Sequence, residues 1–503
     1  MSPWSFLGRH GWLIAIAAVY LYVFPYFPGI RSANELPRVY LVKAMVEDRA
    51  FYIDSSVARW GATADVSPAR GHLYSNKAPG SSMLVVPVFT VVRLVTEPSL
   101  AVSVWLCRFV AGILPMLGFL WLLWGFLARF APDPAVRRLV LVAYALGSMA
   151  MTYSILFFSH QLGAVCVGSA WILAVDVAER RRGLRAMAIA GALAGAAPLV
   201  DYQALFAAVP VAIYVVARMW RTMNRAELWR AVGVGAAAAA IPIAILLAYH
   251  AVCFGSPWRT GYDASTTFAA FHQQGFLGIT ALRWEAFYGS MIRPDNGLVF
   301  LAPWLLISIP GSVVLARTER GTAAVGIAVA VIYILFVSSI NFWRGGWGVG
   351  PRYITAMLPF LLPAIAAQLQ AWKSRPIVLG IAAATIVTGV AIYSLANVTF
   401  PYWPDSVRNP LVEITFRMLG DGLVAGNLGS ALGVTSWIGA APYFALVAGL
   451  LGWAILRVAG WRAVAIAAAV GATILVVYAQ LPTSPRAHSD RVYGFVRSAV
   501  IER

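Results

Sequence analysis

The chain has 503 residues, of which 60% are hydrophobic and only 12% charged, and its mean hydropathy is +0.76. Soluble domains carry about a quarter charged residues, so this composition excludes an ordinary soluble protein and indicates an integral membrane protein. A net charge of +18 would raise nucleic acid as a partner in a soluble protein. Here the basic residues gather in short loops between apolar runs, the positive-inside pattern of membrane proteins, and we expect no nucleic-acid partner. The clusters are Arg137-Arg138, Arg180-Arg181-Arg182 with Arg185, Arg218/Arg221/Arg225/Arg230, Arg317/Arg320, Lys373/Arg375 and Arg457/Arg462.

Apolar runs of roughly 18 to 25 residues recur from end to end, and each is long enough to cross a bilayer. They predict an all-α bundle of about thirteen spanning helices that forms a single membrane domain over residues 1–503. With the N-terminus on the cytoplasmic side, every Arg-rich short loop falls on that side. The first run lacks a small-residue cleavage pattern, so we interpret it as a retained span rather than a signal peptide. The expected spans are 11–30, 100–127, 139–158, 161–177, 186–200, 203–219, 231–253, 296–316, 322–340, 353–371, 376–396, 438–456 and 463–480.

The segment 79–97 is apolar enough to span, but counting it as a span would reverse the side of every later basic loop. We therefore expect it to be a membrane-lying or re-entrant segment. Four larger stretches then face outward, and loops on a rigid scaffold are where chemistry usually lies. These external stretches are 31–78, 254–294, 397–437 and a C-terminal tail over 481–503.

The loop 31–78 is expected to be the catalytic loop, because it packs five carboxylates and seven Lys or Arg residues beside the membrane. Apolar residues at helical spacing over 37–46 predict an interfacial helix that holds Glu35 at the outer membrane surface. A carboxylate there suits general-base work on a hydroxyl, and the alternative is a solvated loop charge. Asp65 and Asp54 are weaker candidates, divided between pairing with a loop Arg and catalysis.

Lys77 follows Tyr74 and precedes Pro79-Gly80, just before the membrane-lying segment. A lysine there can present a point charge to a phosphate at headgroup depth. The alternative is a lysine that snorkels to the interface, which would need neither the flanking Pro-Gly pair nor the tyrosine. We therefore favour phosphate binding for Lys77.

A second basic group lies at an external helix entrance, where Arg344 and Arg352 stand among glycines and the indole of Trp347. Guanidinium groups bind phosphate in a bidentate manner, and aromatic faces stack on sugar rings or amphiphiles. The alternative is an aromatic belt with interfacial arginines. Weaker candidates lie at other external helix ends. His160 could be a capped turn residue, and Asp201 could pair with an Arg or line a cavity. Arg293 stands beside Asp295.

Together these patches resemble the GT-C superfamily of lipid-dependent glycosyltransferases, particularly family 39, which includes the protein O-mannosyltransferases and lipid A aminoarabinose transferase. In that family an acidic pair, usually Asp-Glu, follows the first span and precedes an interfacial helix containing Tyr and Arg. The equivalent here is Asn34-Glu35-Leu36-Pro37-Arg38-Val39-Tyr40, and the family's Lys-Pro-Pro-Leu stretch looks like Lys77-Ala78-Pro79-Gly80. The stretches 293–298 and 350–353 look like features of family 39-like relatives. Asn34 replaces the commonly catalytic Asp, so the expected base moves to Glu35, with Asp65 in reserve.

The resemblance implies a sugar donor linked to polyprenyl phosphate and transfer to a lipid, glycan or protein acceptor, on the outer face of the cytoplasmic (inner) membrane. A base that activates the hydroxyl for a single displacement inverts the anomeric configuration. No cofactor is required, the three cysteines have no metal spacing, and metal assistance stays open. The leading alternative from another class is a secondary transporter or flippase, whose site would lie near the bilayer midplane. The expected substrate-binding residues are Asn34, Arg38, Arg59, Tyr74, Lys77, His160, Asp201, Arg293, Arg344, Trp347, Arg352 and Tyr353.

Overall fold

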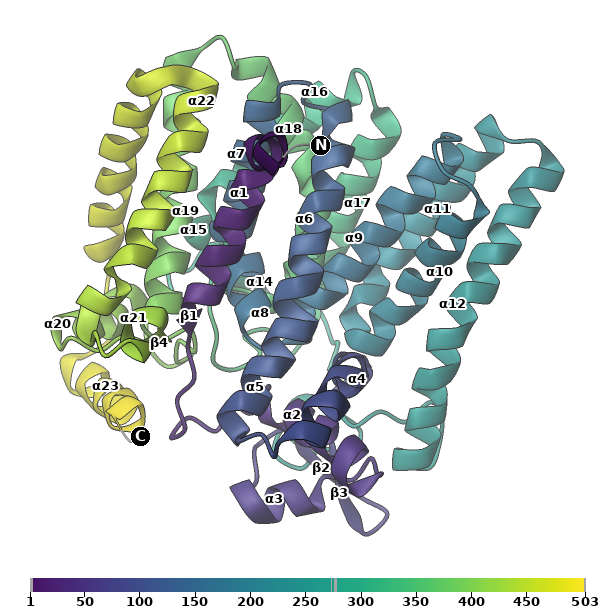
Figure 1. The fold of residues 1–503 in the computed structure, drawn as a ribbon, viewed down its shortest axis with the longest axis vertical. Coiled ribbons are helices and arrows are strands. Elements are labelled where there is room, and N and C mark those ends of the chain that lie inside the picture. Colours follow the sequence, from purple (N-terminus) through teal and green to yellow (C-terminus); the bar gives the residue numbers. More distant parts are fainter. Residues whose placement is uncertain (1–2, 273, 276–277, 502–503) are drawn as a thin grey trace.

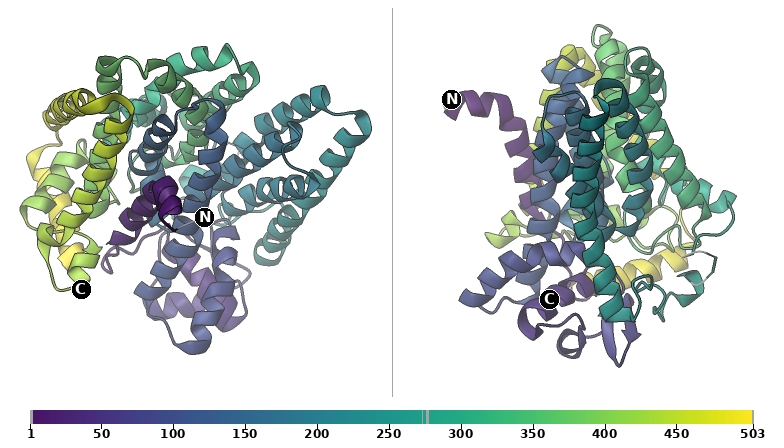
Figure 2. Two further views of the ribbon diagram at one scale, coloured as in Figure 1. Left: turned by 45° about the horizontal axis from the view of Figure 1, so that its top comes forward. Right: turned by 90° about the vertical axis from the view of Figure 1, so that its right-hand side faces the viewer.

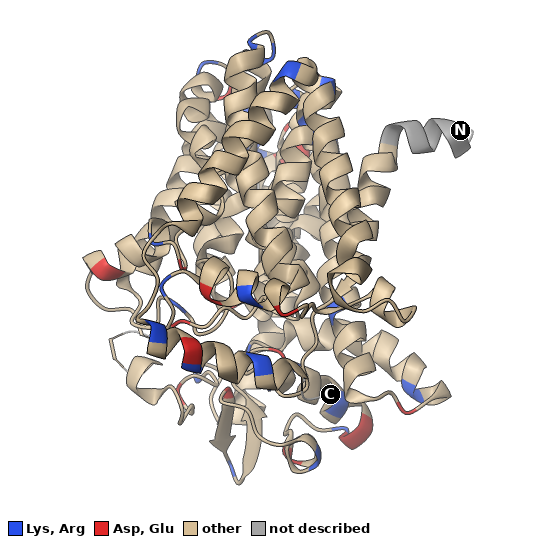
Figure 3. Ribbon diagram, turned by 90° about the vertical axis from the view of Figure 1, so that its left-hand side faces the viewer, with Lys and Arg blue, Asp and Glu red and all other residues tan. Residues whose placement is uncertain are grey.

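The structure is a computed structural model that describes residues 3–272, 274–275 and 278–501. It is a bundle of helices that run roughly side by side, with short helices and a hairpin gathered at the lower end (Figure 1). Charged residues concentrate towards the two ends of the bundle (Figure 3). Within the described ranges, eight helices are long and apolar enough to cross a membrane, or nine if one bent pair forms a single span. The expected all-α membrane bundle is confirmed.

Each of the thirteen predicted spans contains a helix or broken helical segments, although the first helix ends at Tyr22 rather than at residue 30. The last two are the two helices of α22, which are separated by non-helical backbone at Gly460, and 139–158 is a pair of helices bent by 57°. Three segments are shorter than a full span: 10–22, 184–200 and 303–316. The spanning elements are α1 (Pro3–Tyr22), α5 (Leu100–Arg108) continuing through a π-helical turn into α6 (Leu114–Phe126), α7 (Pro134–Leu146), α8 (Met149–Ile155), α9 (Ser159–Ala178), α10 (Leu184–Val200), α11 (Leu205–Thr222), α12 (Arg225–Phe254), α15 (Leu298–Leu301), α16 (Ser308–Ala316), α17 (Arg320–Ser339), α18 (Leu358–Trp372), α19 (Pro376–Val398) and α22 (Ser436–Ala479).

The residues between the first two spans form a compact layer at the lower end of the bundle (Figure 1). This layer holds α2 (Leu36–Lys43), α3 (Asp54–Trp60) and a hairpin of β2 (Val66–Ala69) and β3 (His72–Ser75). The predicted interfacial helix is present as α2, but all its residues are buried, because α4 and β3 pack against it. The apolar segment predicted to lie along the membrane forms α4 (Gly80–Val95), beside α2.

The chain ends in a helix that returns to the same layer. This helix, α23 (Arg486–Ile501), lies at the lower end together with the β2–β3 hairpin in every view (Figures 1 and 2). A two-residue pairing between β1 (Val23–Phe24) and β4 (Gly426–Asn427) also ties the first span to the segment before α22. Residues from both ends of the sequence therefore meet beside the loop 31–78.

The interior of the bundle is held by close helix contacts. Helix α9 is buried over its whole length, and α10 beside it packs on α12 through small residues. A Cβ atom on Gly191 would lie 2.1 Å from the carbonyl oxygen of Gly235, so only glycine allows this approach. Such small-residue contacts are how membrane helices gain packing without a hydrophobic driving force.

The bundle predicts which loops share a compartment. The loops joining α9 to α10, α11 to α12, α16 to α17 and α18 to α19 lie at the upper end, opposite the loop 31–78 (Figure 1). We expect Ser55→Cys to react with an impermeant thiol reagent in intact cells and Arg181→Cys to react only after permeabilisation, since both positions are exposed. The three native cysteines are buried, which keeps the background low. The opposite labelling pattern would show that the membrane orientation is reversed.

Candidate active site

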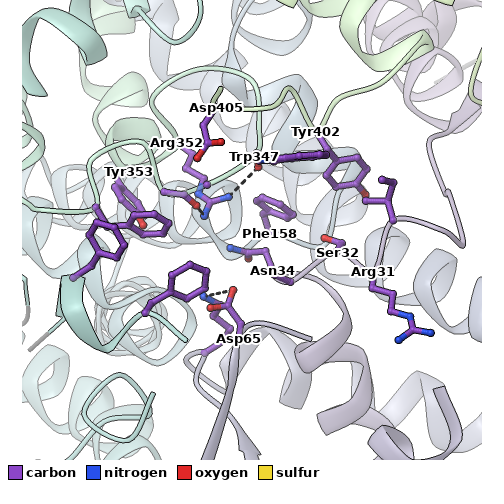
Figure 4. A pocket seen from close by; sticks show the side chains of 18 of the residues that line it. Arg31, Ser32, Asn34, Asp65, Phe158, Trp347, Arg352, Tyr353, Tyr402 and Asp405 are labelled. Atoms are coloured by element: carbon purple, nitrogen blue, oxygen red, sulfur yellow. Dashed lines mark hydrogen bonds and ion pairs between the residues drawn. The ribbon is translucent and has the colours of Figure 1, made fainter. Parts of the chain in front are cut away.

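A cavity of about 540 Å³ opens at the lower end of the bundle (Figure 4). Its walls come from segments spread along the chain, from the loop after α1 to α23. Asp65 and Arg352 lie on different sides of it, with Asn34 and Phe158 between them. Six of the residues predicted from the sequence line this cavity: Asn34, Asp65, Lys77, Trp347, Arg352 and Tyr353.

Asp65 and Lys77 form a buried ion pair at the cavity wall. Asp65 Oδ2 lies 2.9 Å from Lys77 Nζ, and both side chains are 7% exposed. Asn76 Nδ2 donates a hydrogen bond of 3.1 Å to Asp65 Oδ1, which fixes the carboxylate. Burial lowers the pKa of Lys77 to about 8, and the positive charges of Arg38 and Arg352 act in the same direction, while Asp65 opposes them. The ammonium group is therefore a cation near neutral pH that loses its charge in mildly alkaline solution.

Arg352 is fixed by a glycine turn. Its guanidinium donates hydrogen bonds to the carbonyl oxygens of Gly345 and Trp347 and lies over the ring of Phe158, 5.2 Å from the centroid. Gly345 has a φ of +70°, and a Cβ atom there would lie 2.7 Å from Arg352 Nε and 2.9 Å from the ring of Tyr353. Both the conformation and the close approach require glycine. The glycine-rich stretch thus holds a guanidinium in the cavity wall.

A small chamber of about 20 Å³ adjoins the cavity, and it is lined almost wholly by polar side chains. Arg38 crosses one side of it, donating hydrogen bonds to Asn34 and to Ser159 Oγ at 2.9 Å. His160 Nδ1 lies 2.8 Å from Asp201 Oδ2 on another side. The polar residues of this small chamber are Asn34, Arg38, Lys77, His160, Asp201, Tyr202, Tyr262, Arg352 and Tyr353.

Glu35, the residue expected to be the base, is fully engaged in an ion pair. Its carboxylate lies 2.8 Å from both Nε and Nη2 of Arg108, and it accepts hydrogen bonds from the Tyr402 hydroxyl and the Phe157 amide. The side chain is 2% exposed and does not line the main cavity. Burial alone would raise the pKa of Glu35, but the charge of Arg108 and these hydrogen bonds hold it below its usual value. This geometry is typical of a structural ion pair.

Four of the predicted binding residues lie away from the cavity. Arg59 forms an exposed ion pair with Glu97 at 2.9 Å, and Tyr74 packs against Phe254 behind the hairpin. Arg293 and Arg344 both pair with the carboxylate of Asp295, which is almost fully buried. That three-residue cluster braces the loops on which it lies. None of the four lines the cavity or the small chamber.

Several cavity residues were not among the sequence candidates. The rings of Tyr262 and His272 are in tilted contact, with centroids 4.6 Å apart, and the ring of Tyr262 lies 5.3 Å from Lys77 Nζ. Burial lowers the pKa of His272 to about 4, and the charge of Lys77 adds to this shift. Asp405 is an exposed carboxylate at the cavity with no partner among the described residues. The aromatic side chains that complete the wall are Phe158, Phe268, Phe271, Phe342, Tyr402 and Phe495.

A second cavity of about 320 Å³ lies next to the first, and the two share Ile30, Arg31, Ser32 and Tyr402. Arg31 points away from the centre of the main cavity (Figure 4). The walls of the second cavity are mostly apolar, from the loop after α1 and the start of α5. No group of three or more His, Cys, Asp or Glu side chains in the described part of the chain could hold a metal ion.

No protein-family profile and no curated protein matches the chain in sequence. Among solved structures, ArnT from Cupriavidus metallidurans, bound to undecaprenyl phosphate, is similar with a TM-score of 0.50 and 14% identity, over 95% of this chain and 76% of ArnT. The apo state of the same protein gives 0.49 and 13%, over 99% and 77%. The archaeal oligosaccharyltransferase AglB from Archaeoglobus fulgidus, in complex with an inhibitory peptide and a dolichol-phosphate, gives 0.41 and 12%, over 96% and 61%. The likeness to bound ArnT concerns the fold: the chain shares the fold of ArnT over 95% of its length.

Proposed function

We propose that this chain is a membrane glycosyltransferase that moves a sugar from a polyprenyl-phosphate carrier to a hydroxyl group of a lipid, glycan or protein on the external face. One observation carries the proposal. A carboxylate, Asp65, and two cations, Lys77 and Arg352, line one aromatic-walled cavity at the end of a membrane bundle. That is the set of groups needed to activate a hydroxyl and to stabilise a departing phosphate.

Lys77 and Arg352 are the proposed ligands of the donor phosphate. They line both the cavity and the small chamber, and the positive charge of Arg352 helps to lower the pKa of Lys77. An anion placed between them would relieve this repulsion and favour the charged lysine. The aromatic wall of Trp347, Tyr353 and Phe158 offers faces on which a sugar ring can stack.

Asp65 is the proposed general base, in place of Glu35. Its carboxylate lines the cavity, whereas both oxygens of Glu35 are occupied by Arg108, Tyr402 and the Phe157 amide. Lys77 links the two halves of the reaction, because a phosphate that draws the ammonium group towards itself also frees Asp65 Oδ2 to accept a proton. The acceptor oxygen then attacks the anomeric carbon as the bond to phosphate breaks, and this single displacement inverts the configuration.

Two further observations support this function over transport. The fold is shared with ArnT, whose structure holds undecaprenyl phosphate. The clustered ionisable side chains described above lie at one end of the bundle, whereas transporter sites lie near the midplane on paired broken helices. A solute bound halfway along the bundle would contradict the proposal.

Neutralising either phosphate ligand is expected to weaken donor binding. In Lys77→Gln and Arg352→Gln, the lost charge-assisted hydrogen bond is worth about 1.5–3 kcal/mol, which is roughly ten- to hundredfold in affinity. The measurement is binding of undecaprenyl phosphate to the purified protein. The wild-type affinity should also fall as the pH rises above about 8, since free Lys77 then loses its proton.

The matched control is Arg59→Gln, because Arg59 is a cation of the same loop whose partner Glu97 lies outside the cavity. Its affinity should equal that of the wild type. Equal losses in all three variants would indicate a general electrostatic attraction to the lipid, and unchanged affinity in Lys77→Gln and Arg352→Gln would refute the phosphate assignment.

A further inference from the structure

A histidine–aspartate pair beside the cavity has no role in the reaction proposed above. His160 stands at the start of α9, is 6% exposed, and directs Nδ1 at Asp201 Oδ2 over 2.8 Å. A carboxylate in that position keeps a hydrogen on Nδ1. The other ring nitrogen, Nε2, is buried and has no hydrogen-bond partner among the described residues.

The imidazole lines the small chamber together with three cationic side chains, Arg38, Lys77 and Arg352. The chamber measures about 20 Å³, and a space of roughly 10–15 Å³ is enough for one water-sized group. A single phosphate oxygen has about that size. The surroundings therefore favour an oxyanion that reaches in from the main cavity. The chamber and this cavity share Asn34, Lys77, Tyr262, Arg352 and Tyr353.

We propose that His160 binds the phosphate of the carrier lipid as an imidazolium and that Asp201 holds the ring in place. The assignment rests on the proposed function, because it takes the phosphate of that reaction as the ligand. A neutral imidazole with its hydrogen on Nδ1 offers only a lone pair at Nε2, which an oxyanion repels. Binding of the phosphate is therefore coupled to the uptake of one proton at Nε2.

This coupling would act on the reaction as well as on binding. The donor phosphodiester carries one negative charge, and the released phosphate monoester carries about −1.5 to −2 at pH 7. As the bond from the anomeric carbon to oxygen breaks, its electron pair stays on the phosphate oxygen, while the acceptor proton goes to Asp65. The hydrogen bond from His160 strengthens as this charge develops, which stabilises the transition state. Asp201 is a positioning residue, since it acts through His160.

A test must distinguish the titration of the imidazole from the titration of the groups around it. The arginines stay charged, but Lys77, with a pKa of about 8, titrates in a neighbouring range, and the ligand phosphate titrates near pH 6. Both titrations occur in the wild type and in a His160 variant, so the ratio of the two affinities removes their contribution. The charged and titratable groups that face or surround His160 are Asp201, Arg38, Lys77, Arg352, Tyr153, Tyr202, Tyr262 and Tyr353.

The test is binding of undecaprenyl phosphate to the full chain in detergent, from about pH 6 to pH 8.5, in wild type and in His160→Gln. We expect wild type to bind about ten- to hundredfold more tightly at the acidic end, the value of a hydrogen bond to a charged group. The ratio should shrink towards one at the alkaline end, where imidazolium is lost. Asp201→Asn should behave like His160→Gln, because Asn leaves the imidazolium uncompensated. If His160→Gln does not fold, the Asp201→Asn variant provides the same test.

His72→Gln is the control, since His72 lies on the hairpin outside the cavity, and its ratio to wild type should be one at every pH. If the wild type binds the lipid but the ratio of its affinity to that of His160→Gln is near one, or does not change with pH, the role of His160 is refuted. The proposed function would then still stand. A wild type that binds no undecaprenyl phosphate would overturn both. Equally tight competition by inorganic phosphate would identify a free-phosphate site and overturn the lipid assignment.

Discussion

Asp65→Asn is expected to reduce glycosyl transfer by a factor of about 10²–10⁴, the usual contribution of a positioned general base. Asn keeps the size of the side chain and its bond to Asn76, but it cannot accept the hydroxyl proton. Binding of undecaprenyl phosphate should persist, because Lys77 and Arg352 remain. The measurement is release of undecaprenyl phosphate from a panel of its sugar conjugates, in membranes that contain the variant.

Asp54→Asn is the matched control for this experiment. Asp54 lies in the same loop, at the start of α3, and contacts His72 at 3.4 Å outside the cavity. Its turnover should stay within about threefold of wild type, since an exposed pair contributes little. Near-normal turnover in Asp65→Asn would remove it as the base and direct the search to Asp405, the exposed carboxylate of the same cavity.

Glu35→Gln is expected to act mainly on stability. It leaves the Arg108 guanidinium buried without its counter-charge, and breaking a buried pair in this way costs about 3–5 kcal/mol. The unfolding temperature of the purified protein in detergent should fall accordingly. The loss would also loosen the junction of α5 with the loop after α1, which Arg108 joins through Glu35 and the carbonyl oxygen of Pro25.

A double-mutant cycle tests the same ion pair. If the pair is structural, Glu35→Gln combined with Arg108→Gln should be less destabilised than the sum of the two single variants, because no lone charge remains buried. A Glu35→Gln protein with wild-type unfolding temperature and strongly reduced turnover would instead restore Glu35 as the catalytic base.

The sequence predicted the bundle well because spanning helices have to be long and apolar, and both properties are local. It also separated 438–456 from 463–480, and the structure agrees, because the backbone of Gly460 within α22 is not helical and divides it into two helices. It also placed the helix over 37–46 at the membrane interface. The structure shows in addition that α4 and the hairpin cover α2, which the spacing of its apolar residues could not reveal.

The site was predictable where its residues lie near one another in sequence. Asp65 and Lys77 belong to one loop and meet through the β2–β3 hairpin. The ion pair of Glu35 with Arg108 could not be predicted from spacing, because the two residues are 73 positions apart. A signal was available, because an arginine inside an apolar run must face a polar partner. The aromatic residues of 262–272 and Tyr402 carried no such signal, since aromatic side chains are common wherever a loop meets a membrane.

The distribution of the cavity wall along the chain has a consequence for biosynthesis. One wall residue, Phe495, lies on α23, and its ring contacts that of Trp347 with centroids 6.0 Å apart. The cavity is therefore incomplete until translation has passed residue 495 and α23 has folded back beside the first loop. A nascent chain whose spans are already inserted would still lack this part of its substrate pocket. The membrane bundle is therefore synthesised before the site can be completed.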